Sequence, residues 1–210
     1  MRSVTIMVML AAAMLAAACG GAERTGSAPG ASDPEASSAH AETAKGPPAL
    51  EVVAGRALDA LAALPEHGPG ELAAVVHPKE GITFAPYAYI DEDHRRLLPE
   101  ELEPAWRSGE IARWGAYDGR GDPIDLSFTD YVDRFVWDRD YREAEPNVGG
   151  VRGRGNTISN IDEVFPGSRV VEYYVPAREH ELDWRALRLV FEEYEGELRL
   201  VAVVHDEWTI

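Results

Sequence analysis

The sequence predicts an α+β domain in which N-terminal helices pack on a curved, mainly antiparallel sheet. Apolar residues recur at helical spacing over residues 50–64, near the start of the domain. Toward the C-terminus, two runs rich in Val, Leu and aromatic residues, 184–194 and 198–208, flank a short turn that contains Gly196. The second run is apolar on both sides through Val204, which is typical of a strand near the middle of a sheet.

Helices and strands alternate over the first half of the domain. The helix over 50–64 ends at Pro65, and a short helix over 71–76 ends before His77-Pro78, because the residue before proline is disfavoured in α conformation. Residues 82–90 are predicted as a strand interrupted by Pro86, and 98–107 as a helix with Pro99 in its first turn.

The second half is richer in strands. Residues 111–117 are predicted as a strand, followed by a turn rich in Asp and Gly. Ser127 is the expected N-cap of the next helix, whose apolar stripe runs to Val136. A long irregular stretch, 141–160, precedes a strand over 169–175 and the terminal hairpin.

The N-terminal segment is typical of an export signal. Met1-Arg2 is followed by an apolar run over 4–18 that is shorter than the ~20 residues a spanning helix needs, which favours a cleaved signal over a permanent transmembrane anchor. We therefore expect a signal peptide over 1–18, a lipidated cysteine and flexible linker over 19–48, and one globular domain over 49–210.

Cys19 is the only cysteine, so it has no intramolecular disulfide partner. The segment LAAACG at 15–20 resembles the lipobox of bacterial lipoproteins, although alanine stands at the usual leucine position. The resemblance implies that Cys19 carries lipid and anchors the chain to a bilayer at the cell envelope. The expected location is the outer membrane where one exists, and otherwise the outer face of the plasma membrane. A free cysteine in an ordinary signal is the alternative.

Composition excludes several classes of function. The mature domain contains neither cysteine nor methionine, which excludes thiol catalysis and iron–sulfur clusters. The net charge of −17 is spread along the chain and makes nucleic acid an unfavourable partner. No cofactor-binding motif is present in the sequence, and no cofactor is expected.

The predicted order of elements resembles the NTF2-like (cystatin-like α+β cone) fold, in which a bent sheet and early helices enclose a pocket. A closer resemblance, to an uncharacterised family of bacterial lipoproteins, covers essentially all of residues 50–210 and implies no assigned activity. It rests on segments HP at 77–78, GITFAPYAY at 81–89, WGAYDGRGDPI at 114–124, GN at 155–156, NIDE at 160–163, DWRALRLVF at 183–191 and HDEWTI at 205–210.

Titratable residues at the end of the last strand define a candidate catalytic site. If His77 reaches the same pocket, Asp206 or Glu207 could orient a histidine as general base for hydrolysis or isomerisation, and His205 with Asp206 is the pair we expect to act. The alternative is a histidine that bonds to backbone at the edge of the sheet. Without a nucleophile motif, an enzyme is the second interpretation.

A candidate ligand site combines the glycine-rich stretch with aromatic residues. Arg152 and Arg154 among glycines could bind an anion or make surface ion pairs. The predicted ligand-binding residues are Arg152, Arg154, Asn156, Tyr87 and Trp208.

No metal site is expected. Asp118, Asp122 and Asp125 lack the alternation of a calcium loop, and turn formation explains them. The leading hypothesis is a non-catalytic, lipid-anchored envelope domain that binds a small molecule or an envelope protein. A structural module with an exposed apolar patch is a third possibility.

Overall fold

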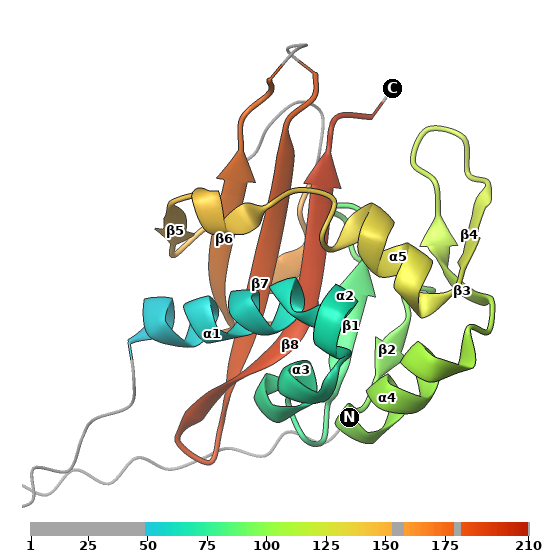
Figure 1. Cartoon of the computed structure of the whole chain (residues 1–210). Coiled ribbons are helices and arrows are strands. Elements are labelled where there is room, and N and C mark those ends of the chain that lie inside the picture. The colour runs from blue at the N-terminus through green and yellow to red at the C-terminus, as the bar shows by residue number, and fades with distance from the viewer. Residues whose placement is uncertain (1–48, 153–157, 179–181, 210) are drawn as a thin grey trace, which may run out of the picture. The chain divides into compact units, whose positions relative to one another are not determined.

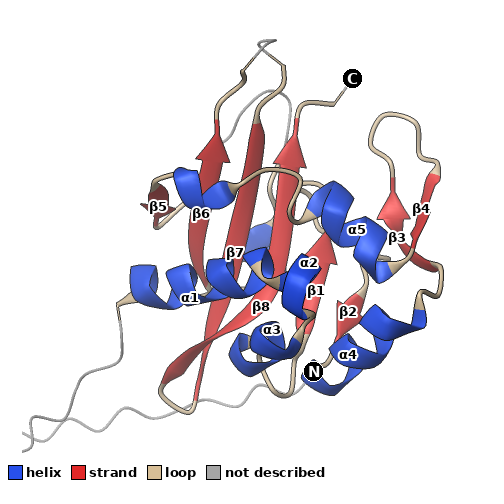
Figure 2. Ribbon diagram, in the orientation of Figure 1, coloured by secondary structure: helices blue, strands red, loops and turns tan. Residues whose placement is uncertain are grey.

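A computed structural model of the chain describes residues 49–152, 158–178 and 182–209. Helices cover one side of a six-stranded sheet, and a two-stranded sheet lies beside it (Figure 1, Figure 2). This arrangement confirms the α+β class. The elements are α1 (Leu50–Ala62), α2 (Leu64–His67), α3 (Gly70–Val75), β1 (Ile82–Ala85), β2 (Arg96–Leu97), α4 (Pro99–Ser108), β3 (Ala112–Ala116), β4 (Pro123–Leu126), α5 (Phe128–Phe135), the 3₁₀ helix η1 (Tyr141–Glu143), β5 (Pro146–Val148), α6 (Ile161–Val164), β6 (Arg169–Val175), β7 (Arg185–Tyr194) and β8 (Glu197–Glu207).

The main sheet has the order β2-β1-β8-β7-β6-β5. Its pairings are antiparallel except that of β1 with β8, which is parallel. The last strand is therefore internal, as its apolar run predicts. The parallel pairing joins residues 83–85 to 202–204, and no local pattern in the sequence indicates it. Among the described residues, no helix is long and apolar enough to cross a membrane.

The terminal hairpin turns through Glu195 and Gly196, which both have positive φ (53° and 82°). Positive φ at both central positions is typical of a type I′ turn, whose twist matches that of the flanking strands. Farther along β8, Val190 pairs with Ala202 while Phe191 pairs with Leu200, so Val201 is an extra residue in the ladder. This β-bulge changes which side of the sheet every later residue of β8 faces.

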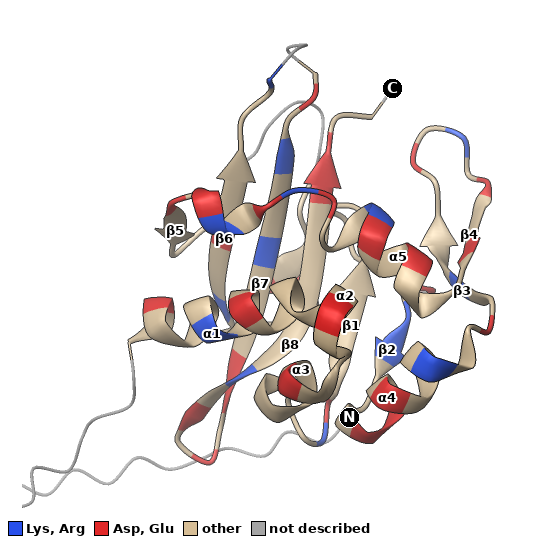
Figure 3. Cartoon of the chain, viewed as in Figure 1, with Lys and Arg blue, Asp and Glu red and all other residues tan. Residues whose placement is uncertain are grey.

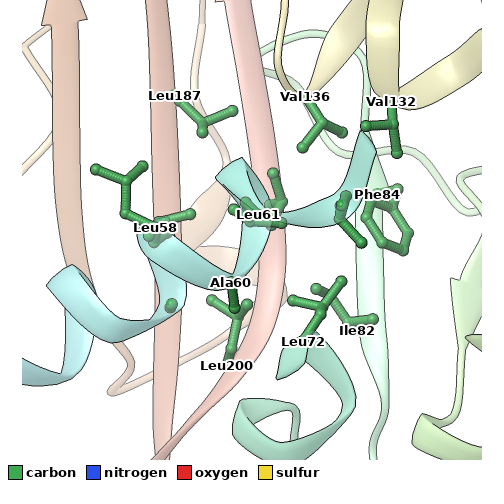
Figure 4. Packing of buried hydrophobic residues seen from close by; sticks show 14 of the residues in the cluster. Leu58, Ala60, Leu61, Leu72, Ile82, Phe84, Val132, Val136, Leu187 and Leu200 are labelled. Carbon is green, nitrogen blue, oxygen red and sulfur yellow. The ribbon is translucent and has the colours of Figure 1, made fainter. Parts of the chain in front are cut away.

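The larger core lies between the sheet and the helices, and Figure 4 shows its central part. Each fully buried Leu or Phe there contributes roughly 1.5–3 kcal/mol through removal of apolar surface from water. A smaller cluster covers the opposite side of the sheet. Its members include Val190, Val204, Ile161 and Phe165, so α6 and the residue after it cover that side. We call the two sides the helical side and the α6 side.

The helices begin and end close to the predicted positions. Ser127 caps α5, since its Oγ accepts a hydrogen bond from the Asp130 amide at 3.2 Å. The predicted strand over 82–90 ends early, at Ala85, because Pro86 has no N–H to donate. The short elements α2, β2, β4, η1, β5 and α6 were not predicted, since two to four residues carry too little periodicity. Pro65, where the first helix was expected to stop, lies inside α2, in the first turn where proline is tolerated.

Candidate functional site

The predicted catalytic residues lie in three different places. The bulge directs His205 to the helical side, where its ring packs edge-on against Phe135 at 5.8 Å. Asp206, the next residue, faces the α6 side. His77 lies near the hairpin turn: its amide bonds to the Leu200 carbonyl, roughly 16 Å along β8 from His205. The structure therefore does not bring His205, Asp206 and His77 together.

Asp138, on the loop after α5, is the carboxylate that contacts His205. The His205 Nε2 lies 3.4 Å from Asp138 Oδ2, and its Nδ1 lies 3.0 Å from the Pro86 carbonyl oxygen. Asp138 also accepts hydrogen bonds from the Tyr141 hydroxyl and from Arg185 Nε, each at 2.7 Å. Both ring nitrogens of His205 thus face oxygen atoms, which holds the imidazole in one orientation.

Two arginines complete this cluster at the end of β8. Arg185 Nη2 lies 3.1 Å from Glu207, and Arg134 contacts both oxygens of the same carboxylate. Figure 3 shows the mixture of acidic and basic residues where β7, β8 and α5 meet. We call Arg134, Asp138, Arg185, His205 and Glu207 the β8-end cluster.

The electrostatics of the β8-end cluster favour the ionised carboxylate. Burial alone would raise the pKa of Asp138, but the neighbouring His205 ring, with the Tyr141 hydroxyl and Arg185, holds that pKa well below its usual range. Nearby, burial, with a smaller effect from Glu207, raises the pKa of Tyr87 to about 12. The cluster thus resembles a structural ion-pair network.

Metal binding and base catalysis both meet obstacles in the β8-end cluster. Ligand atoms of Asp138, His205 and Glu207 lie within 4.8 Å of one another, a spacing that a metal ion requires. However, Arg185 bridges the two carboxylates, so a divalent cation would have to displace its guanidinium group. His205 has 0% exposed surface, so a substrate has no path to its ring in this conformation.

A second polar group lies on the α6 side of the sheet. Arg188 in β7 donates from Nε to Glu172 in β6 at 3.0 Å and from Nη2 to Asp206 in β8 at 2.6 Å. All three side chains are at most 1% exposed. The remaining guanidinium nitrogen, Nη1, is buried and has no hydrogen-bond partner among the described residues.

A cavity of about 480 Å³ opens over this row of charged residues. Arg188 and Asp206 are part of its lining, together with Val170. Its walls come from the segment after β5 and from the segment around α6 up to the start of β6. The lining residues of these two segments include Gly149, Gly150, Val151, Ser159, Ile161, Asp162, Ser168 and Arg169. We call this space the α6-side cavity. Its volume is typical of a small-molecule site.

The predicted ligand-binding residues are distributed over several regions. Arg152 is exposed and directly follows Val151 in the wall of the α6-side cavity. Arg154 and Asn156 lie outside the described residues. Tyr87 lines a different cleft, and Trp208 is 38% exposed just beyond the end of β8.

The three aspartates considered for calcium serve other contacts. Asp125 pairs with Arg113 across the β3–β4 hairpin, and Asp118 accepts a hydrogen bond from the Gly119 amide at 2.9 Å. Asp122 lies 3.8 Å from Arg120.

Sequence reasoning missed Glu172, Arg188 and Asp138. Two of them do carry a signal: Arg188 stands between Leu187 and Leu189, and Glu172 occupies an equivalent place within an apolar strand. A charged residue inside an apolar strand requires a buried partner. Asp138 follows a helix in an ordinary polar loop, so its sequence context contains no such signal.

Comparisons of the chain with protein-family models, with curated proteins and with solved structures found no match.

Proposed function

We propose that this chain is a lipid-anchored cell-envelope protein whose domain binds a small polar molecule in the α6-side cavity. The observation that supports it is the buried Nη1 of Arg188, a hydrogen-bond donor without a partner among the described residues, in the lining of a cavity large enough for a ligand. We further propose, from the order of its helices and strands, that the domain has the NTF2-like cone fold. We also propose that it is a member of the bacterial lipoprotein family that its sequence segments resemble.

The energetics explain why a ligand is expected at Arg188. A buried donor without a partner costs about 1–3 kcal/mol, and more where it belongs to a charged group. Glu172 and Asp206 already accept from Nε and Nη2, which fixes the guanidinium plane and leaves Nη1 as the donor available to a bound molecule. A ligand oxygen that accepts from Nη1 would recover this cost on binding. The ligand is therefore a polar molecule that carries an acceptor oxygen.

Binding accounts for the arrangement better than catalysis. A general base must lie within hydrogen-bond reach of the substrate. The histidine at the end of β8 is fully buried on the helical side, whereas the cavity lies on the α6 side. Among the residues that the structure describes, the cavity lining contains carboxylate, guanidinium, hydroxyl and backbone groups but no histidine. These groups position a ligand through hydrogen bonds and need not transform it.

The test is a ligand screen by thermal shift on the full chain, followed by calorimetry. Arg188→Lys keeps the charge but loses the planar fork, so we expect it to weaken binding of a confirmed ligand about tenfold or more. Arg199→Lys, at a partly exposed arginine of the same sheet, is the matched control and should bind normally. A ligand that binds Arg188→Lys as tightly as the wild type would refute the assignment.

A further inference from the structure

A second cleft, of about 670 Å³, lies between the segment after β1 and the loop that joins β3 to β4. Three tyrosines contribute to its lining, namely Tyr87, Tyr89 and Tyr117. Ala88, between the first two, lines the α6-side cavity instead, so the chain from 86 to 90 separates the two spaces. We call the second space the tyrosine cleft. None of the β8-end cluster lines it.

Backbone and ring contacts hold the tyrosine cleft in shape. The amide of Tyr117 donates to the Asp122 carbonyl at 2.7 Å, and its own carbonyl accepts from the Gly121 amide at 2.8 Å. Tyr87 packs edge-on against Phe135 at 5.8 Å. A site whose rings are fixed before binding loses less conformational entropy when a ligand enters.

The polar groups of the tyrosine cleft favour positive charge. Asp91 and Asp118 are both in its lining, and Arg120 is the one arginine there within the described part of the chain. Asp118 is held in place by the Gly119 amide and the Thr209 hydroxyl. Burial lowers the pKa of His94, so this histidine adds no positive charge at neutral pH.

The chain itself already places one cation on these rings. The guanidinium carbon of Arg120 lies 5.5 Å from the centroid of the Tyr117 ring, within the range of a cation–π contact. Tyr89, which is 49% exposed, remains accessible to a molecule from solvent. Carboxylates and the negative faces of aromatic rings attract the same kind of group, an organic cation.

We infer that the tyrosine cleft binds a small organic cation with an alkylammonium group. The ammonium contacts the faces of Tyr87 and Tyr89, and Asp91 and Asp118 balance its charge. The net charge of −17 on the chain raises the local concentration of such cations at low ionic strength. This site is separate from the α6-side cavity, so the two proposals can fail independently.

The test compares choline with 3,3-dimethylbutan-1-ol, its uncharged analogue of the same shape, by ligand-observed NMR and calorimetry on the full chain. We expect choline to bind, the uncharged analogue to bind at least tenfold more weakly, and added salt to weaken choline binding. Tyr89→Ala should weaken choline binding about threefold or more, whereas Tyr89→Phe keeps the ring and the affinity. Asp118→Asn should weaken it as well.

Four results would overturn the inference. A cation site must bind choline more tightly than its uncharged analogue, so equal binding of the two refutes it. Absence of choline binding, or full affinity in Tyr89→Ala, does the same. Binding of cellotetraose in place of choline would assign the cleft to a neutral glycan. Ile111→Ala, at a side chain 60% exposed and outside the cleft lining, is the control variant and should bind as the wild type does.

Discussion

At the scale of single residues, Asp138 connects three side chains at the β8 end. It receives hydrogen bonds from Tyr141 and Arg185 and contacts His205, although it lies in the loop after α5. Its side chain is 11% exposed, so these contacts form largely out of water. Removing the carboxylate would leave Arg185 and His205 with fewer acceptors in a buried environment.

We predict that Asp138→Asn lowers the free energy of unfolding by roughly 3 kcal/mol at neutral pH, since it breaks a largely buried ion pair. The pKa of Asp138 is lower in the folded state than in the unfolded chain. Its contribution is therefore fully present above the unfolded pKa of about 4 and is lost as pH falls through the folded pKa. Urea unfolding at pH 7 and at about pH 3 measures both effects.

The control for this prediction is Asp140→Asn, which removes an exposed pair with Arg142. It should change stability little, because solvent screens exposed pairs. If Asp138→Asn and the wild type lose stability in parallel between pH 7 and pH 3, Asp138 does not make the predicted contribution.

At the scale of elements, the main strands could be predicted and their pairing could not. The alternation in β7 and the apolar run in β8 predict a hairpin with an internal last strand, as the sheet order confirms. The bulge at Val201 has no signature in the sequence, yet it decides that His205 and Asp206 face the helical and α6 sides respectively. For that reason the sequence identified polar residues at the strand end without showing which of them meet.

The hairpin turn offers a prediction at this scale. Glu195 has a φ of 53°, a conformation that costs energy for most residues and less for asparagine. Glu195→Asn should raise the free energy of unfolding by about 0.5 kcal/mol, because Asn-Gly is the preferred pair for a type I′ turn. Denaturant titration measures the change, with Glu193→Asn on the adjacent strand as control. A loss of stability in Glu195→Asn would argue against this turn type.

At the scale of the whole molecule, three polar regions lie apart from one another. The β8-end cluster lies on the helical side, the row Glu172–Arg188–Asp206 lies on the α6 side, and the tyrosine cleft lies near the β3–β4 loop. The α6-side cavity was only partly predictable from the sequence. Asp206 was recognised there as a candidate site residue, but its partner Arg188, on the neighbouring strand β7, was not. The bulge at Val201 decides that Asp206 faces the side of Arg188, and the bulge has no signature in the sequence.

The proposed lipid anchor also concerns the whole molecule. We expect Cys19→Ala to abolish incorporation of labelled palmitate and to move the full chain from the membrane fraction to the soluble fraction, since acyl chains supply about 0.8 kcal/mol per buried CH₂. A chain with Cys19→Ser should behave identically. Membrane association that survives both substitutions would show that something other than Cys19 holds the protein there.

The most direct test of ligand binding is native mass spectrometry of the full chain purified from its source cells, compared with its mass after denaturation. We predict a stoichiometric extra mass on the folded protein that denaturation releases and that Arg188→Lys reduces. A folded protein that carries no extra mass and that no polar compound stabilises would contradict it. An extra mass retained in full by Arg188→Lys would contradict the assignment to the α6-side cavity.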